Sequence, residues 1–123
     1  MSAILLYLGA GLTFIWGISH LFPTKNVVAG FGNISEDNRQ IITMEWIVEG
    51  IFLVFIGTLV AVVTFIDPLS AASNAVYIVS SLGLLVLALV SFFTGFKVKF
   101  LPFRLCPLIF LVSAALVISG AFV

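Results

Sequence analysis

The sequence predicts an all-α fold, a four-helix transmembrane bundle, and three observations support this class. First, 63% of the 123 residues are hydrophobic and 8% are charged, whereas a soluble domain carries about 25% charged residues. Second, the charges separate four uncharged stretches, each close to the roughly 20 apolar residues that cross a bilayer as a helix. Third, runs such as Ile51–Val63 are apolar throughout and lack the alternation of a membrane β-barrel. We therefore expect one integral membrane domain over residues 1–123.

The first predicted helix covers residues 3–21. It lies in an uncharged stretch that ends before Lys25, and Pro23 is expected to close it because proline interrupts a continuing helix. A secretory signal peptide has basic residues ahead of its apolar core, and no Lys or Arg precedes Lys25. We therefore expect this helix to remain part of the protein.

The second predicted helix covers residues 42–66, and its start can lie as early as residue 36. Ser35 is a typical N-cap residue, and Glu36 and Asp37 place negative charge in the first turn, where it stabilises the helix dipole. Nothing in the sequence interrupts a helix from there to Asp67. The early start would extend this helix by a turn or two beyond the membrane.

The third and fourth predicted helices cover residues 74–96 and 105–123. The segment between them interleaves basic and aromatic residues, and its charges are Lys97, Lys99 and Arg104. Beside two membrane helices, this pattern is typical of an interfacial segment whose rings enter the headgroup boundary. We expect the three cations to contact anionic lipid headgroups at the cytoplasmic face.

All five basic residues fall in two of the predicted loops. Lys25 and Arg39 lie in the first loop and the other three lie in the third, whereas the termini and the second loop have none. With four spans, the first and third loops share one side of the membrane. The positive-inside rule then predicts that both loops are cytoplasmic and both termini are outside. The expected location is the bacterial inner (plasma) membrane.

Composition also argues against several classes of function. The formal net charge is zero, so nucleic acid is not an expected partner, because its binding depends on clustered Lys and Arg. One cysteine cannot form a disulfide framework. The sequence has no recognisable nucleophile–base set, phosphate-binding glycine loop or paired-cysteine redox motif. We therefore do not expect an enzyme unless a polar cluster holds a cofactor.

The candidate site is a polar cluster at one membrane boundary. Glu45 and Glu49 are four residues apart, which places both carboxylates on one face of the second helix. His20 ends the first helix at the same level, on a stripe of small and polar residues that suits a bundle interior. We expect these three side chains to lie together. The remaining candidates are Arg39, as a counter-charge, and Trp16 and Trp46 on the flanks.

Three interpretations of this cluster stay open. Paired carboxylates beside a histidine suit proton handling. His20, Glu45 and Glu49 would also supply part of a ligand set for zinc, iron or manganese, although the chain has no second histidine. The third interpretation is interfacial anchoring, with charged and aromatic side chains at the headgroup boundary. Glu49 separates the three because its expected depth is the hardest to reconcile with a surface role.

Short motifs in the first half resemble DoxX-like four-helix membrane proteins. The run Gly17–Pro23, GISHLFP, resembles the exit of the first helix in that superfamily, and Glu49–Gly50 before an apolar run is similar to its second helix. Length and helix number agree as well. Some members are associated with quinol oxidation or membrane redox complexes, so the resemblance implies an accessory role in a quinone-linked complex or the handling of a small molecule.

The leading functional hypothesis is a non-catalytic membrane subunit or binding protein. It would hold a lipophilic small molecule or a partner helix near His20, Glu45 and Glu49. The alternative is a proton-coupled transporter that works as a homo-oligomer, because four helices rarely enclose a pathway alone. The outer halves of the second and fourth helices are nearly apolar, which favours binding over transport. An accessory role in a larger, quinone-linked complex is the third expectation.

Overall fold

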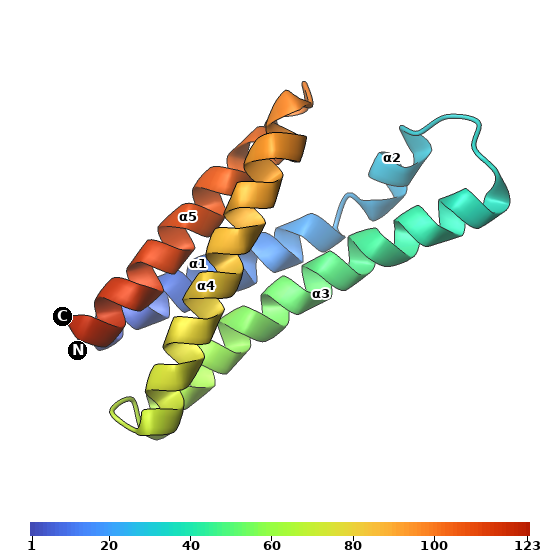
Figure 1. The fold of residues 1–123 in the computed structure, drawn as a ribbon. Coiled ribbons are helices and arrows are strands. Elements are labelled where there is room, and N and C mark those ends of the chain that lie inside the picture. Colours follow the sequence, from blue (N-terminus) through green and yellow to red (C-terminus); the bar gives the residue numbers. More distant parts are fainter.

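The computed structural model describes residues 1–123, and every regular element in it is helical (Figure 1). Four helices are long and apolar enough to cross a membrane, which confirms the predicted all-α, four-helix transmembrane class. Their length and composition are those of an integral membrane protein. In chain order the helices are α1 (Ala3–Leu21), α2 (Thr24–Ala29), α3 (Glu36–Ile66), α4 (Ala71–Thr94) and α5 (Leu101–Phe122), with a 3₁₀ turn, η1, at Gly95–Lys97.

The sequence predicts both ends of α1 but does not predict α2. This helix of six residues packs on α3 through its buried residue Val28. A helix this short is unstable alone, so tertiary packing holds it. The chain then turns at Gly32, whose φ of +71° lies in the left-handed region that favours glycine.

The early start of α3 is confirmed. The Ser35 hydroxyl accepts a hydrogen bond from the backbone N–H of Asn38 at 3.2 Å, and Glu36 and Asp37 occupy the first turn. With 31 residues, α3 is about 46 Å long. Because the hydrocarbon core of a bilayer is only about 30 Å thick, the first turns of α3 extend beyond it.

The last two helices begin earlier than the sequence predicts. α4 begins at Ala71, because the Ser70 hydroxyl accepts a hydrogen bond from the Ser73 backbone N–H at 3.0 Å and caps the helix there. α5 begins at Leu101, and Pro102 suits its first turn, where the missing N–H has no helical partner in any case. Half of the expected interfacial loop is therefore helical.

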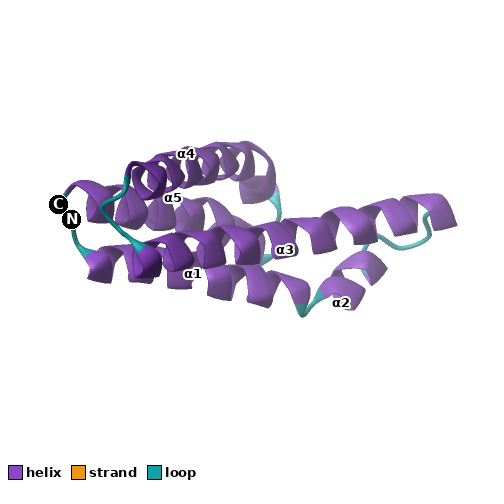
Figure 2. Cartoon of the chain, turned by 90° about the horizontal axis from the view of Figure 1, so that it is seen from below, coloured by secondary structure: helices purple, strands orange, loops and turns teal.

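The four long helices form two antiparallel pairs, α1 with α3 and α4 with α5, and α1 also packs along α5. The pairs cross at an angle, so they lie close together near the termini and diverge toward the other end (Figure 1). Figure 2 shows α2 and the first turns of α3 extending beyond α4 and α5. We call the divergent end the basic end. It carries all the basic residues, Lys25, Arg39, Lys97, Lys99 and Arg104.

Glycines set the close approach of α1 to its neighbours. A Cβ built on Gly17 or Gly57 would lie 2.6 to 2.8 Å from backbone atoms of the facing helix, in the interface between α1 and α3. A Cβ on Gly9 would lie 2.7 Å from a side chain of α5. Small residues of this kind are how membrane helices gain packing contact. The resulting interfaces fix the level of α1 against α3, and with it the geometry of the site.

The interior has two buried clusters, one on each side of the bundle centre. The cluster nearer the basic end includes Leu53, Leu84 and Phe110, and the other includes Leu6 and Tyr77. Large apolar side chains cover the outward faces of all four long helices. Those faces suit contact with a lipid bilayer, where exposed apolar side chains cost nothing.

Candidate functional site

The basic end brings His20 and Glu49 together. His20 lies in the last turn of α1, and Glu49 lies on α3 next to Gly50, where α1 and α3 are close. The distance from His20 Nε2 to Glu49 Oε2 is 3.5 Å, and the two side chains are 7% and 43% exposed. The imidazole is thus inside the bundle, whereas the carboxylate lies at its border.

Trp46 fixes the position of His20. Its indole N–H donates a hydrogen bond to the backbone carbonyl oxygen of His20 at 2.7 Å. Its ring also stacks on the imidazole, with centroids 3.9 Å apart and planes inclined by 15°. One residue of α3 therefore holds both the main chain and the side chain at the end of α1.

Trp16 lies one turn before His20 on α1. Its Nε1 atom is buried and forms no hydrogen bond. His20 Nε2 is also buried without a hydrogen bond, and Glu49 Oε2 faces it at 3.5 Å. A buried polar atom without a partner costs about 1–3 kcal/mol. Two such atoms in one region are therefore groups that a ligand can satisfy.

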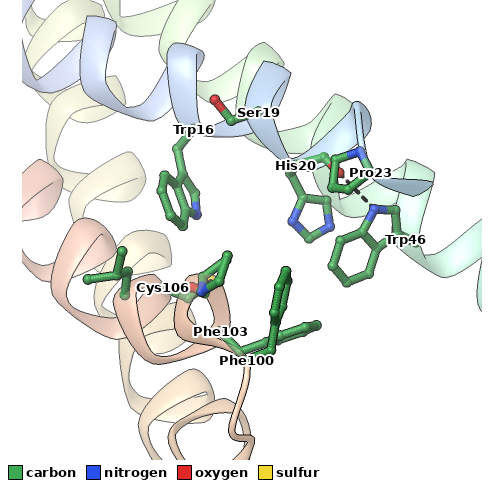
Figure 3. Close-up of a pocket in the computed structure, with 10 residues that line it drawn as sticks. Trp16, Ser19, His20, Pro23, Trp46, Phe100, Phe103 and Cys106 are labelled. Carbon is green, nitrogen blue, oxygen red and sulfur yellow. Dashed lines mark hydrogen bonds between the residues drawn. The ribbon is translucent and has the colours of Figure 1, made fainter. Parts of the chain in front are cut away.

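A cavity of about 360 Å³ lies among these side chains, between α1, α3 and the start of α5. Figure 3 shows the rings of Trp16, His20, Trp46, Phe100 and Phe103 converging on it, with the Trp16 nitrogen directed toward the interior of the group. We call it the aromatic cavity. Its other lining residues are Ser19, Pro23, Pro102, Leu105 and Cys106.

A second cavity, of about 240 Å³, lies on the other side of His20, between α3, α4 and α5. Glu49, Ser91 and Thr94 belong to its wall, so its lining is more polar than that of the aromatic cavity. His20, Phe103 and Cys106 line both cavities. The His20 side chain is therefore part of a partition between two spaces, one aromatic and one that contains a carboxylate.

Two of the predicted cluster residues lie outside this arrangement. Glu45 is exposed and forms no hydrogen bond or ion pair. The face of α3 that packs on α1 runs through Trp46 and Gly50, and Glu49 lies at its edge. Four residues turn a helix by about 40° beyond a full turn, which carries Glu45 farther from that face. Arg39 also fails as a counter-charge, because its Nε pairs with Glu36 Oε2 at 3.7 Å.

The same exposure of Glu45 bears on the predicted metal-ligand set. No three His, Cys, Asp or Glu side chains are grouped closely enough to hold a metal ion. His20 and Glu49 form only a pair, since Glu45 turns away. The predicted set of one imidazole and two carboxylates is therefore not assembled in this fold.

Phe100 and Phe103 are the site residues that the sequence does not predict. Phe103 meets Trp46 edge-on, with ring centroids 5.5 Å apart, and Phe100 meets Phe103 at 5.9 Å. The aromatic residues of this segment are visible in the sequence, but they are assigned there to the lipid boundary. Their place in the site depends on the early start of α5, which turns Phe103 toward α3.

The predicted lipid-interface residues lie at the tip of α4 and α5 and are not among the residues that line the aromatic cavity. Lys97 ends η1, Lys99 follows it, and Arg104 lies in the first turn of α5. The Arg104 Nε–H donates a hydrogen bond to the Val98 carbonyl oxygen at 3.0 Å. Contact of these cations with anionic lipid stays a prediction.

Comparison of the chain with protein-family models, with curated proteins and with solved structures finds no match. The resemblance of Gly17–Pro23 and Glu49–Gly50 to DoxX-like proteins therefore stays a prediction.

Proposed function

We propose that the protein is a non-catalytic membrane protein that binds a lipophilic small molecule in the aromatic cavity. The observation that carries the proposal is the combination of a 360 Å³ cavity with aromatic walls and two buried nitrogens that form no hydrogen bond, Trp16 Nε1 and, 3.5 Å from Glu49, His20 Nε2. Ligand sites are typically apolar and aromatic pockets with a few polar groups that orient the ligand. We place the protein in the bacterial inner membrane, with both termini outside, as a homo-oligomer or a member of a larger complex.

The walls of the cavity define the class of ligand. Flat aromatic surfaces from Trp46 and Phe103 favour a planar ring, and the Trp16 N–H requires a hydrogen-bond acceptor. The volume is near the lower end of the about 300–1,000 Å³ that small-molecule sites occupy. The ligand class is therefore a small, planar, lipophilic compound with a carbonyl or similar acceptor.

Native mass spectrometry of the protein released from mild detergent tests the proposal. We expect a reproducible added mass on the unmodified chain and on Glu45→Gln, because Glu45 is exposed and away from the cavity. The added mass should be lost in His20→Ala and reduced in Trp16→Phe, and the second variant keeps an aromatic ring and so guards against a folding defect. A bare chain in every sample, or an adduct that all variants retain equally, would contradict binding at this site.

Proton-coupled transport is a second candidate, and the partition at His20 favours it. His20 lies between the two cavities and is 3.5 Å from Glu49, so the pair could pass a proton while a solute moves. Liposomes that contain the protein and a pH-sensitive dye would show solute-driven acidification. We expect Glu49→Gln to abolish it and Glu45→Gln to leave it intact. Equal acidification with both variants would remove this candidate.

A further inference from the structure

The basic end has a second polar feature, separate from the aromatic cavity. A pocket of about 250 Å³ lies between α2 and α3. α2 contributes Thr24 and Lys25, and α3 contributes Arg39, Gln40 and Thr43. We call it the basic pocket, because its lining contains two cations and no carboxylate. Neither α2 nor this juxtaposition is visible in the sequence, where Lys25 and Arg39 are 14 positions apart.

The two cations of the basic pocket are largely free to bind an anion. Lys25 forms no ion pair, and the single ion pair of Arg39 uses Nε, at 3.7 Å from Glu36, so its two terminal nitrogens have no partner. Glu36 is 70% exposed and does not line the pocket. The nearest neutral polar groups are already engaged, since Gln40 Nε2 bonds Glu36 and Thr43 Oγ1 bonds the Arg39 carbonyl. Lys25 therefore has no acidic partner, whereas Glu36 offsets part of the charge of Arg39 from outside the pocket.

The depth of the pocket matches the headgroup layer of a membrane. Trp46 marks the end of α1 through its bond to His20, and the lining residues Thr43 and Arg39 lie three and seven residues earlier on α3. They are about 5 Å and 10 Å farther from the bilayer centre along the helix, so the pocket extends from the headgroup layer to its outer edge. Headgroups occupy about 5–8 Å on each side of the hydrocarbon core. Phe22 and Met44 near the pocket are 85% and 53% exposed. Exposed apolar side chains next to cations are the pattern of a segment seated in the membrane interface.

We propose that the basic pocket binds the phosphate group of an anionic phospholipid. The Arg39 guanidinium offers paired N–H donors to phosphate oxygens, and the Lys25 ammonium adds a compact positive charge from the opposite wall. The acyl chains of the lipid would lie against the exposed apolar residues below the pocket. This site is independent of the aromatic cavity, so it stands whether or not that cavity binds a ligand.

Lipid retention in native mass spectrometry tests the proposal. The purified protein is incubated in mild detergent with equal concentrations of phosphatidylglycerol and phosphatidylcholine, and the fractions carrying each lipid are compared. A cation near an anionic headgroup contributes roughly fivefold in affinity, so loss of both should cost roughly 25-fold. We expect Lys25→Gln/Arg39→Gln to lose most of the preference for phosphatidylglycerol over phosphatidylcholine.

The matched control removes the same charge from the tip of α4 and α5. Lys97→Gln/Lys99→Gln removes two interfacial cations that do not form a pocket, so it should lower the preference for phosphatidylglycerol less than Lys25→Gln/Arg39→Gln does. Lys25→Arg/Arg39→Lys should keep the preference, which excludes misfolding as the cause. Equal loss in both neutralised double variants would show general surface charge and overturn the pocket. An unchanged preference in Lys25→Gln/Arg39→Gln would also overturn it. Displacement of the lipid by millimolar inorganic phosphate would assign the pocket to free phosphate and overturn the lipid as its ligand.

Discussion

The imidazole of His20 and the indole of Trp16 are buried without a hydrogen bond, unlike most polar groups inside this bundle. The main-chain carbonyl of His20 is satisfied by Trp46, whereas His20 Nε2 and Trp16 Nε1 are buried without partners. The hydroxyls of Thr13, Thr58 and other helical threonines instead bond the carbonyl four residues earlier. Self-satisfied hydroxyls of this kind are structural. Four buried polar atoms form no hydrogen bond, the two nitrogens together with Ser81 Oγ and Ser113 Oγ, and only the nitrogens belong to residues that line the aromatic cavity.

Replacing each tryptophan by phenylalanine should separate these two roles. Trp46→Phe removes the donor to His20 and should lower the free energy of unfolding by about 1 kcal/mol, or somewhat more because the carbonyl is left unpaired. Trp16→Phe removes a donor that has no partner, so its unfolding free energy should stay equal or rise slightly. Denaturation in a sodium dodecyl sulfate titration, followed by circular dichroism, measures both. A larger loss for Trp16→Phe than for Trp46→Phe would contradict the hydrogen-bond assignments.

Trp16→Phe should also weaken ligand binding at the aromatic cavity, although it leaves stability intact. Acetophenone, a planar lipophilic ketone, and ethylbenzene, which has the same size but no acceptor, form a suitable pair of probes. Loss of one neutral hydrogen bond should reduce acetophenone affinity about fivefold and leave ethylbenzene affinity unchanged. Isothermal titration calorimetry in detergent reports both. If the variant affected the two probes equally, the Trp16 N–H would not be the recognition group.

At the scale of helices, the fold depends on how closely α1 approaches α3. The Gly17 and Gly57 contacts leave no room for a side chain, so they fix both the spacing and the relative height of these helices. That height brings His20 level with Trp46 and Glu49. By contrast, nothing lies within 4 Å of a Cβ built on Gly11 of the same helix. Within α1, Gly17 is therefore required for helix contact, whereas Gly11 is not.

Alanine substitutions at Gly17 and Gly11 should change the free energy of unfolding in opposite directions. Gly17→Ala forces a Cβ to within 2.7 Å of the Val54 backbone nitrogen, and such overpacking typically costs about 1–3 kcal/mol. Gly11→Ala meets open space and should stabilise α1 by up to about 1 kcal/mol, since alanine is the better helix former. Unfolding in a sodium dodecyl sulfate titration gives both values. Equal destabilisation by both variants would mean that α1 and α3 are not in this close contact.

At the scale of the whole molecule, the two helix pairs separate at the basic end and create both cavities there. The termini and the short connection before α4 lie at the opposite end, where the pairs are close and Thr64 Oγ1 contacts the Tyr77 hydroxyl at 3.0 Å. All basic residues lie at the divergent end. The positive-inside rule therefore predicts that both cavities and the basic pocket open toward the cytoplasm.

Cysteine labelling in intact cells tests this orientation. In a Cys106→Ser background, which removes the single native cysteine, Lys99→Cys should react with a membrane-impermeant maleimide only after the cells are permeabilised. Asp67→Cys, in the connection at the opposite end, should react without permeabilisation. The reverse pattern would invert the topology and place the site outside.

Much of the fold follows from the sequence because membrane-spanning helices are local. Uncharged runs predict the four helices, and Ser35 as a cap predicts the early start of α3; the structure confirms both. The positions of the charges predict that the basic residues share one side of the membrane. The bounds of α1 match the prediction. The starts of α4 and α5 differ from the prediction, because Ser70 and Pro102 begin helices in segments that the sequence predicts as loops.

The composition of the site was decided by tertiary structure. Helical spacing alone places Glu45 with Glu49, but the direction in which α3 faces α1 depends on the glycine contacts, and it leaves Glu45 exposed. Phe103 enters the site only because α5 folds back across α1 and meets Trp46 from a distant part of the chain. The sequence by itself determined where the helices lie in the chain and that lipid surrounds them, since hydropathy and capping act within a few residues. Only the packing of helices determined which side chains share a cavity, because that depends on rotations and heights that no local signal specifies.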